Sequence, residues 1–213
     1  SSWKDNLKDE NDSCYHRIIT TTMDAEIFSI DAKTGKLCKD FGEEGRVDLR
    51  IGLGEHDRAH YFSPSPPAII KDKIIVGGAV ADNINIDVPG GVVRAYDARS
   101  GTLLWFWDPI APGKLPIIEN EETQLYQKGT TNVWSIISVD PELDLIYLPT
   151  GNTSPDNFGG YRNGSDYYSS SIVALNSNNG KVVWSYQTVH HDVWDYDVPS
   201  QPTFYEFNKE GKK

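Results

Sequence analysis

The sequence predicts an all-β fold built from repeated sheets. Short runs rich in β-branched residues recur along the chain, among them residues 16–22 (HRIITTT) and 171–175 (SIVAL). Runs of this kind between polar turns are typical of strands. No long stretch shows the 3.6-residue apolar period of an amphipathic helix. We therefore expect mostly strands, with few or very short helices.

Composition narrows the class of protein. The 213 residues include 6 Trp, 11 Tyr and 7 Phe, which is more aromatic side chain than a disordered chain carries. The net charge of −11 argues against a nucleic-acid partner, because phosphate contacts need Lys and Arg. The longest apolar stretches, such as residues 74–80, are far shorter than the roughly 20 residues that cross a bilayer. Any membrane contact would thus be made by segments outside this sequence.

The expected strands follow a polar start. Residues 1–12 are polar and charged, and we interpret them as a mobile lead-in or linker to a domain over residues 13–213. Residues 25–30 (AEIFSI) alternate in polarity, as a half-buried strand does. Residues 69–76 (IIKDKIIV) form two apolar runs around a polar turn, which predicts a hairpin. Residues 145–148 (LIYL) add a further strand.

An internal repeat organises these strands. In each copy an apolar residue precedes Asp or Asn, and a Gly follows four residues after the Asp or Asn. Asp or Asn opens a tight turn with its side chain, and Gly accepts the positive φ that such a turn needs. Trp105 and Trp184 each follow the repeat Gly by four residues, where they can pack between neighbouring sheets, whereas the first copy has Lys39 there. The three copies are residues 30–37, 96–103 and 175–182.

The spacing of the repeat indicates long loops. The repeat glycines are 66 and 79 residues apart, more than the roughly 40–50 residues of a simple propeller blade. Long loops on a repeated sheet scaffold are typical carriers of function. A β-sandwich with similar hairpin turns is the alternative, but the threefold recurrence, with Trp in two copies, argues against it.

Together with four further segments, the repeat resembles the tryptophan-docking motif of the quinoprotein dehydrogenases, which use pyrroloquinoline quinone (PQQ). The segments occur in family order and are most similar to the membrane-bound glucose dehydrogenase subfamily. The resemblance implies an all-β fold, namely three to four blades of an eight-bladed β-propeller with tryptophan-docking repeats. The segments are 76–97 (containing VGGAVADN and GVVRAYD), 130–135 (TTNVWS), 148–156 (LPTGNTSPD) and 187–199 (QTVHHDVWDYDVP).

The resemblance also implies an activity. Members of this subfamily oxidise an alcohol group of a sugar, polyol or cyclic hydroxy acid, and pass the electrons to ubiquinone. The parent protein would then be periplasmic and anchored in the inner membrane. Because the chain holds about a third of the ring and Lys209, Lys212 and Lys213 match no motif for the family's cofactor-contacting Lys, we expect the isolated chain to be inactive. A non-catalytic propeller scaffold of the bacterial envelope is the alternative.

The same resemblance assigns a catalytic base and a cation site. Asp195, within HDVWD, matches the family's base, which takes the hydroxyl proton; an Asp in a polar turn is the alternative. The cation would be Ca²⁺ or Mg²⁺, which prefer carboxylate and amide oxygens. For Asp82 and Asn83 the alternative is a simple turn, and Thr153 could replace its neighbour Asn152 as a ligand. The positions that match the cation site are Asp82, Asn83, Asn152 and Asp197.

Trp134 is the residue that the resemblance places against the flat cofactor. An indole face gains about 0.5–1.5 kcal/mol by stacking, beyond burial. Trp134 lies outside the repeat frame, whereas a blade-packing Trp would lie inside it. Asn132 and Thr131, which precede it, are candidates for hydrogen bonds to the edge of the cofactor.

Two cysteines, Cys14 and Cys38, are too few for a disulfide scaffold. They are either two buried free thiols or one disulfide. The resemblance places them on adjacent strands of one blade, and a disulfide there fits the periplasmic location that it implies.

Overall fold

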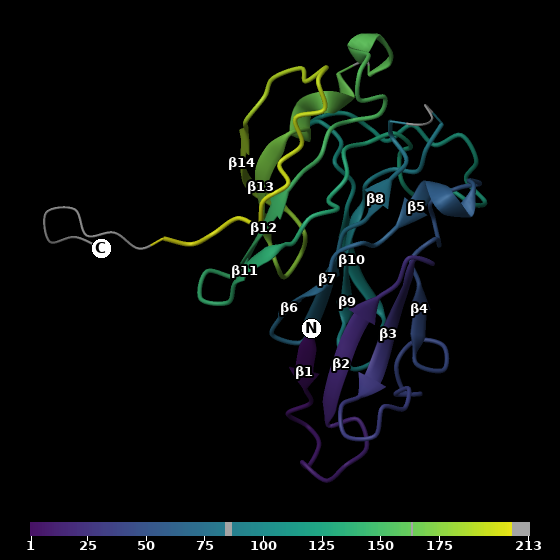
Figure 1. The fold of residues 1–213 in the computed structure, drawn as a ribbon, viewed down its shortest axis with the longest axis vertical. Coiled ribbons are helices and arrows are strands. Elements are labelled where there is room, and N and C mark those ends of the chain that lie inside the picture. The colour runs from purple at the N-terminus through teal and green to yellow at the C-terminus, as the bar shows by residue number, and fades with distance from the viewer. Residues whose placement is uncertain (84–86, 163, 206–213) are drawn as a thin grey trace, which may run out of the picture.

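A computed structural model describes residues 1–83, 87–162 and 164–205 (Figure 1). The predicted all-β class is confirmed: fourteen strands and three 3₁₀ turns make up the regular structure of the described residues. Within them, no helix is long and apolar enough to cross a membrane. Lys209, Lys212 and Lys213 lie outside the described residues.

Three four-stranded antiparallel sheets follow one another along the chain, and we call them blades 1, 2 and 3 (Figure 1). Blade 1 contains β1 (Ser2–Lys4), β2 (His16–Thr21), β3 (Glu26–Asp31) and β4 (Arg46–Asp48). Blade 2 contains β6 (Ala68–Ile70), β7 (Lys73–Val76), β9 (Val93–Asp97) and β10 (Leu103–Trp107). Blade 3 contains β11 (Ser138–Asp140), β12 (Leu145–Pro149), β13 (Ser171–Asn176) and β14 (Val182–Gln187).

Each blade is a meander, because strands that are neighbours in the sheet are also consecutive in the blade. The predicted hairpin at residues 69–76 is confirmed as β6 paired with β7, with Ile70 opposite Lys73. The remaining elements lie in the loops: a short ribbon of β5 (Tyr61–Phe62) and β8 (Ala79–Val80), and the 3₁₀ turns η1 (Arg58–His60), η2 (Gly159–Tyr161) and η3 (Ser165–Tyr168).

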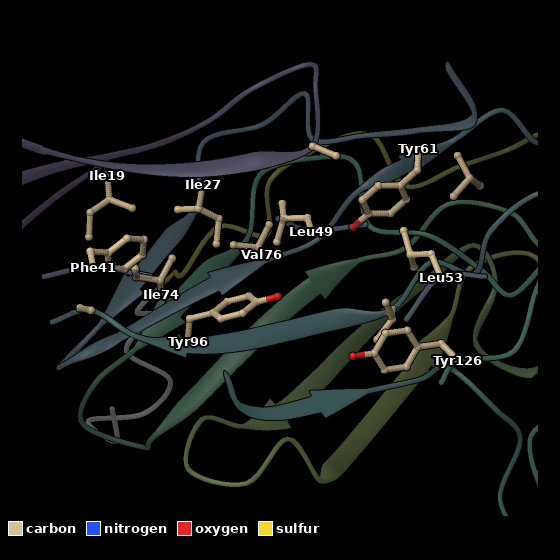
Figure 2. Packing of buried hydrophobic residues seen from close by; sticks show 14 of the residues in the cluster. Ile19, Ile27, Phe41, Leu49, Leu53, Tyr61, Ile74, Val76, Tyr96 and Tyr126 are labelled. Atoms are coloured by element: carbon tan, nitrogen blue, oxygen red, sulfur yellow. The ribbon is translucent and has the colours of Figure 1, made fainter. Parts of the chain in front are cut away.

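Blade 2 is covered on both faces. Successive side chains of a strand point to opposite faces, so Ile74 packs in the apolar cluster with blade 1 and Ile75 packs in the cluster with blade 3. Figure 2 shows the first cluster, in which Ile19 and Ile27 of blade 1 lie above Ile74 and Tyr96 of blade 2. Stacking of sheet faces, rather than one central core, therefore holds the chain together.

The repeat turn links the third strand of each blade to its fourth strand. Trp105 of blade 2 lies against the repeat turn of blade 3, where its Nε1 donates to the Ser177 carbonyl oxygen at 3.0 Å. A Cβ on Gly180 would come within 2.5 Å of the Trp105 ring, and the φ of Gly180 is +68°. Glycine is therefore required at this position both for its backbone and for the close approach of the indole. This contact confirms the predicted tryptophan docking.

Blade 1 meets blade 2 without a docking Trp. Lys39, which stands in place of the Trp, is exposed and pairs with Glu44 at 2.7 Å. The backbone of Gly42 takes the place of the indole, and its N–H donates to the Ser100 carbonyl oxygen at 2.8 Å.

The interpretation of residues 1–12 as a mobile lead-in is wrong for the first five residues. Residues 2–4 form β1, an edge strand of blade 1 that pairs with β2. Trp3 is buried, and the guanidinium groups of Arg17 and Arg99 lie 5.6 and 5.3 Å from its ring centroid. Asp5 is fully buried and accepts two hydrogen bonds from Arg99, at 2.8 and 2.9 Å. Pairing with distant arginines lets Trp3 and Asp5 be buried in an otherwise exposed polar segment.

The two cysteines form a disulfide. Cys14, just before β2, is bonded to Cys38, which follows the repeat turn of blade 1, and their Cα atoms are 5.8 Å apart. Of the two alternatives, free thiols are excluded. The bond ties the segment before β2 to the outer edge of its own blade.

Candidate functional site

Loops from blades 2 and 3 meet at one end of the sheets and bring most of the predicted site residues together. The loop with Thr131 and Asn132 pairs with the loop after β12, through the Gly151 N–H to the Asn132 carbonyl oxygen at 2.8 Å. The Thr131 hydroxyl donates to the Gly151 carbonyl oxygen at 2.5 Å. A Cβ on Gly91 would lie 1.9 Å from the Thr131 carbonyl oxygen, so only glycine lets the chain after Asp82 pass so close.

Two carboxylates are held by side chains of this loop pair. The Asn132 amide nitrogen donates to Asp82 Oδ2 at 2.5 Å. The Trp134 indole Nε1 donates to Asp197 Oδ2 at 2.6 Å, and the Asn152 backbone N–H donates to Asp197 Oδ1, also at 2.6 Å. The resemblance assigned all five residues to this site; the structure joins Asp82 to Asn132, and separately joins Asp197 to Trp134 and Asn152.

The acidic side chains repel one another. Burial, followed by the charges of Asp197 and Asp195, raises the pKa of Asp82 to about 7. Burial also raises the pKa of Asp197, which lies near Asp195. Asp156 has its pKa raised to about 8 by burial and by the charges of Asp82, Asp195 and Asp197. A bound cation would remove this repulsion.

One polar atom at this place has no partner. Asn132 is 1% exposed, and its Oδ1 accepts no hydrogen bond within the described residues. A Cβ on Gly151 would lie 2.9 Å from this oxygen and 3.0 Å from Asp197 Oδ2, so the two oxygens converge above Gly151. Such oxygens are ligands that Ca²⁺ and Mg²⁺ prefer, and the residues present therefore fit a cation.

The carboxylates themselves do not converge on one point. Among the described residues, one group of three His, Cys, Asp or Glu side chains has its ligand atoms within 4.8 Å of one another, namely Cys14, Cys38 and Asp40. Its cysteines form the disulfide, so that group is not a metal site. A cation at the candidate site would need Asp82, which already contacts Asn132, to lie closer to Asp197.

Two of the predicted cation ligands have other surroundings. Asn152 is buried, and its Oδ1 accepts the Thr153 N–H at 2.9 Å while its Nδ2 donates to the carbonyl oxygens of Asp156 and Asp192 at 3.2 Å. This amide braces the loop, so its role as a ligand stays a prediction. Asn83 is exposed, beside the undescribed residues 84–86, and its role also stays a prediction.

Asp195 differs from the other acids because its side chain is exposed and its backbone is in the left-handed region, with φ of +60°. Within the described chain no hydrogen bond reaches its carboxylate. Trp134 is half-buried with its Nε1 edge on Asp197. It differs in this from Trp105 and Trp107, which are buried in the apolar cluster between blades 2 and 3.

Sequence reasoning assigned no role to Asp156, Arg162 or Asp192, which surround the site. Arg162 is buried, and its guanidinium donates to the carbonyl oxygens of Pro155, Asp156 and Asp192. It also lines a cavity of about 630 Å³ on the far side of this loop. None of Asp82, Trp134, Asp195 and Asp197 lines that cavity, so the cavity is separate from the acidic site.

Comparison with known proteins agrees with the geometry. The family model described as "PQQ: Glucose/ethanol/alcohol dehydrogenase, beta-propeller domain" matches residues 1–213. The quinate/shikimate dehydrogenase (quinone) of Acinetobacter baylyi is 42% identical over 92% of this chain and 24% of its own length. The quinoprotein glucose dehydrogenase of Escherichia coli is 40% identical over 94% of this chain and 25% of its own length.

Solved structures give the same result. The quinohemoprotein alcohol dehydrogenase ADHIIG of Pseudomonas putida superposes with a TM-score of 0.70 at 28% identity, over 92% of this chain and 28% of that one. The chain thus spans about a quarter of the length of the curated relatives named above. The match of the family model to every residue, the relatives and the three stacked blades together show that the chain belongs to the PQQ-dependent glucose/ethanol/alcohol dehydrogenases, as part of their β-propeller domain.

Proposed function

We propose that this chain supplies part of the active site of a PQQ-dependent dehydrogenase that oxidises an alcohol group of a sugar, polyol or cyclic hydroxy acid and passes the electrons to a quinone such as ubiquinone. The observation that carries the proposal is the meeting of Asp82, Asn132, Trp134 and Asp197 from separate loops, with Asp195 two residues from Asp197. The relatives named above act on quinate or shikimate and on glucose, and the first is named as quinone-linked.

The residues have distinct tasks in this proposal. Bound PQQ supplies the acceptor for the two electrons of the alcohol, and Ca²⁺ or Mg²⁺ supplies a Lewis acid. Asp82, Asp197 and the unpartnered Oδ1 of Asn132 hold the cation, with Asn83 and Asn152 as further candidates. The exposed carboxylate of Asp195 takes the hydroxyl proton.

Trp134 offers the cofactor a flat face. Its Nε1 is anchored on Asp197, so the ring is oriented by the same carboxylate that we assign to the cation. Stacking on an indole contributes about 0.5–1.5 kcal/mol beyond burial. Asn132 donates a hydrogen bond to Asp82, and Thr131 donates one to Gly151. We keep a direct contact of either residue with the edge of the cofactor as part of the proposal.

A non-catalytic scaffold has no use for this arrangement. Burying acids near one another raises their pKa values, as at Asp82 and Asp156, and it destabilises a protein that holds no cation there. We therefore propose an enzyme and not a scaffold. The parent protein would be anchored in the inner membrane, with this part of it in the periplasm. The chain alone lacks the remaining blades of its relatives and is expected to be inactive.

Replacing the matching segment of the Escherichia coli quinoprotein glucose dehydrogenase with this chain tests the proposal. The chimera should reduce an artificial dye when PQQ, Ca²⁺ and glucose are present. Asp195→Asn should keep PQQ bound and lower kcat by at least about 100-fold, the range of general-base loss. Asp140→Asn, at a turn of blade 3, is the matched control with normal turnover. Near-normal turnover of Asp195→Asn would remove Asp195 as the base, and dye reduction by the isolated chain would contradict its expected inactivity.

A further inference from the structure

The backbone alone orients the side chain of Asp195. Its carboxylate accepts no hydrogen bond within the described residues, so the backbone of residues 194–196 sets the direction of the side chain. That backbone is in the left-handed region, with φ of +60° at Asp195. For an L-residue this conformation is strained, and it persists where neighbouring contacts enforce it.

The enforcing contacts come from one buried carboxylate. Asp192 Oδ1 accepts the Trp194 N–H at 2.9 Å, and Asp192 Oδ2 accepts the Tyr196 N–H at 2.6 Å. The two amides flank Asp195, so Asp192 holds the chain on both sides of it. Asp192 is 1% exposed, whereas Trp194 and Tyr196 point their side chains into solvent and add no packing to the turn.

Asp192 is itself fixed from the other side. The Ser170 hydroxyl donates to Asp192 Oδ2 at 2.8 Å. The Ser170 N–H donates to the Gly151 carbonyl oxygen at 2.9 Å, next to the Asn152 N–H that holds Asp197. The Asp192 carbonyl oxygen accepts from Arg162 and from Asn152 Nδ2. Asp192 therefore connects the turn of Asp195 to the loop that holds Asp197.

We infer that Asp192 is a positioning residue that holds Asp195 in its left-handed conformation, and so fixes the distance of the base from the substrate hydroxyl. The inference rests on the proposed function for the role of Asp195 as the base. It does not rest on that function for the geometry, because the hydrogen bonds of the turn join only residues of this chain. Charged acceptors make the stronger hydrogen bonds, which suits a carboxylate that must hold two amides and a hydroxyl at once.

The inference distinguishes Asp192 from the other conspicuous groups of this segment. His191 is exposed, and its Nδ1 lies 2.8 Å from Asp166 Oδ2 on the outside of the turn. Asn152 contacts Asp192 through the carbonyl oxygen and not through the carboxylate. Asp192→Asn therefore tests the inference directly, because it keeps the side-chain volume and removes one acceptor oxygen. The amide NH₂ that replaces this oxygen cannot accept from a backbone N–H.

Amide hydrogen exchange on the ¹⁵N-labelled chain tests the inference without cofactor or substrate. In the unchanged chain the amides of Trp194 and Tyr196 should be protected. In Asp192→Asn they should exchange at least about tenfold faster, because a hydrogen bond to a charged acceptor is lost, while the amides of β13 keep their rates. Ser170→Ala should give a smaller change at the same amides.

A second measurement reports the conformation of residue 195 itself. The one-bond Cα–Hα coupling differs between left-handed and extended backbone, and it should change at residue 195 in Asp192→Asn. Asp195→Asn is the matched control: Asn also adopts left-handed backbone readily, so the coupling and the two protected amides should stay as they were. This variant abolishes the base and leaves the turn intact.

The outcomes are separable from those of the proposed function. Unchanged exchange and coupling in Asp192→Asn would overturn the inference, whatever the chimera does. Equal acceleration across β13 and β14 would also overturn it, since Asp192 would then stabilise the blade as a whole. A changed turn, together with normal turnover of Asp195→Asn in the chimera, would keep Asp192 as the residue that fixes the turn and would remove Asp195 as the base.

Discussion

Trp105 and Trp184 occupy the same position in two copies of one repeat, and their surroundings differ. Trp105 is 9% exposed and lies on the Gly180 turn of the following blade. Trp184 is 43% exposed, and its described aromatic contact is with Tyr147 of its own blade, at 5.7 Å between ring centroids. The repeat therefore specifies a residue that can dock, and the neighbouring blade decides whether it contributes to stability.

The same difference extends over the two blades. Blade 2 is covered on both faces by the clusters shared with blades 1 and 3. On blade 3, Val183, Trp184 and Tyr186 of β14 are exposed. Chains in this family that are about four times as long have further residues to cover such a face. For the chain described here, blade 2 is the part whose packing is complete.

The largest expected effect follows from this comparison. Trp105→Ala should lower the free energy of unfolding by about 3–5 kcal/mol, since it removes a buried indole and the hydrogen bond to Ser177. Trp184→Ala should lower it by less than about 1 kcal/mol, as at other exposed positions. Urea unfolding followed by far-ultraviolet circular dichroism measures both. Equal losses in the two variants would show that docking on the next blade does not decide the contribution of the repeat Trp.

The strands and the repeat turns could be predicted because their signals are local. Alternation, β-branched runs and the Asp-to-Gly turn each involve residues a few positions apart. The docking of Trp105 followed from the same frame. The burial of Trp3 could not be predicted, because one Trp in a polar segment has no periodicity, and its partners Arg17 and Arg99 are far along the chain.

The site shows the same limit. The resemblance named the acids and the Trp of the loops, and the structure joins Asp82 to Asn132 and Trp134 to Asp197. The resemblance did not reveal that the side-chain oxygen of Asn132 accepts no hydrogen bond within the described residues, or that Asp192 accepts hydrogen bonds from two amides of the turn. These contacts depend on how the loops of two blades approach each other, which no short sequence pattern encodes.

A second pair of substitutions sharpens the comparison at the turn glycines. Gly35 and Gly180 have nearly the same φ, +70° and +68°, but a Cβ on Gly35 would meet no atom within 4 Å. Gly35→Ala should therefore cost only the left-handed backbone, about 1–2 kcal/mol. Gly180→Ala should cost about 2–4 kcal/mol, because its Cβ also collides with Trp105.

Urea unfolding of the two glycine variants gives the difference directly. The backbone cost is nearly common to both, so the excess loss in Gly180→Ala measures the close approach of the indole alone. Combining Gly180→Ala with Trp105→Ala should reduce that excess, since the collision is then absent. Equal losses of unfolding free energy in the two single variants would mean that the interface between blades 2 and 3 accommodates the added Cβ without being destabilised.

The end of blade 2 also contains a half-buried acid, Asp108, whose contribution to stability is smaller at neutral pH than at acid pH. Asp108 follows β10 and accepts the Gln127 N–H at 2.7 Å, and burial raises its pKa to about 6. Because the folded chain binds this proton more tightly than the unfolded chain, the contribution of Asp108 is fully present below about pH 4. It is lost as the pH rises through about 6.

Asp108→Asn should therefore raise the free energy of unfolding at pH 7 by about 1–2 kcal/mol, and change it little at pH 4, where Asp108 is already neutral. The Asn Oδ1 still accepts from Gln127, so the loop remains in place. Asp82 and Asp156 titrate in both chains, and the difference between the two curves of stability against pH isolates Asp108. Parallel curves would contradict the prediction, because they would show that ionised Asp108 does not lower the free energy of unfolding.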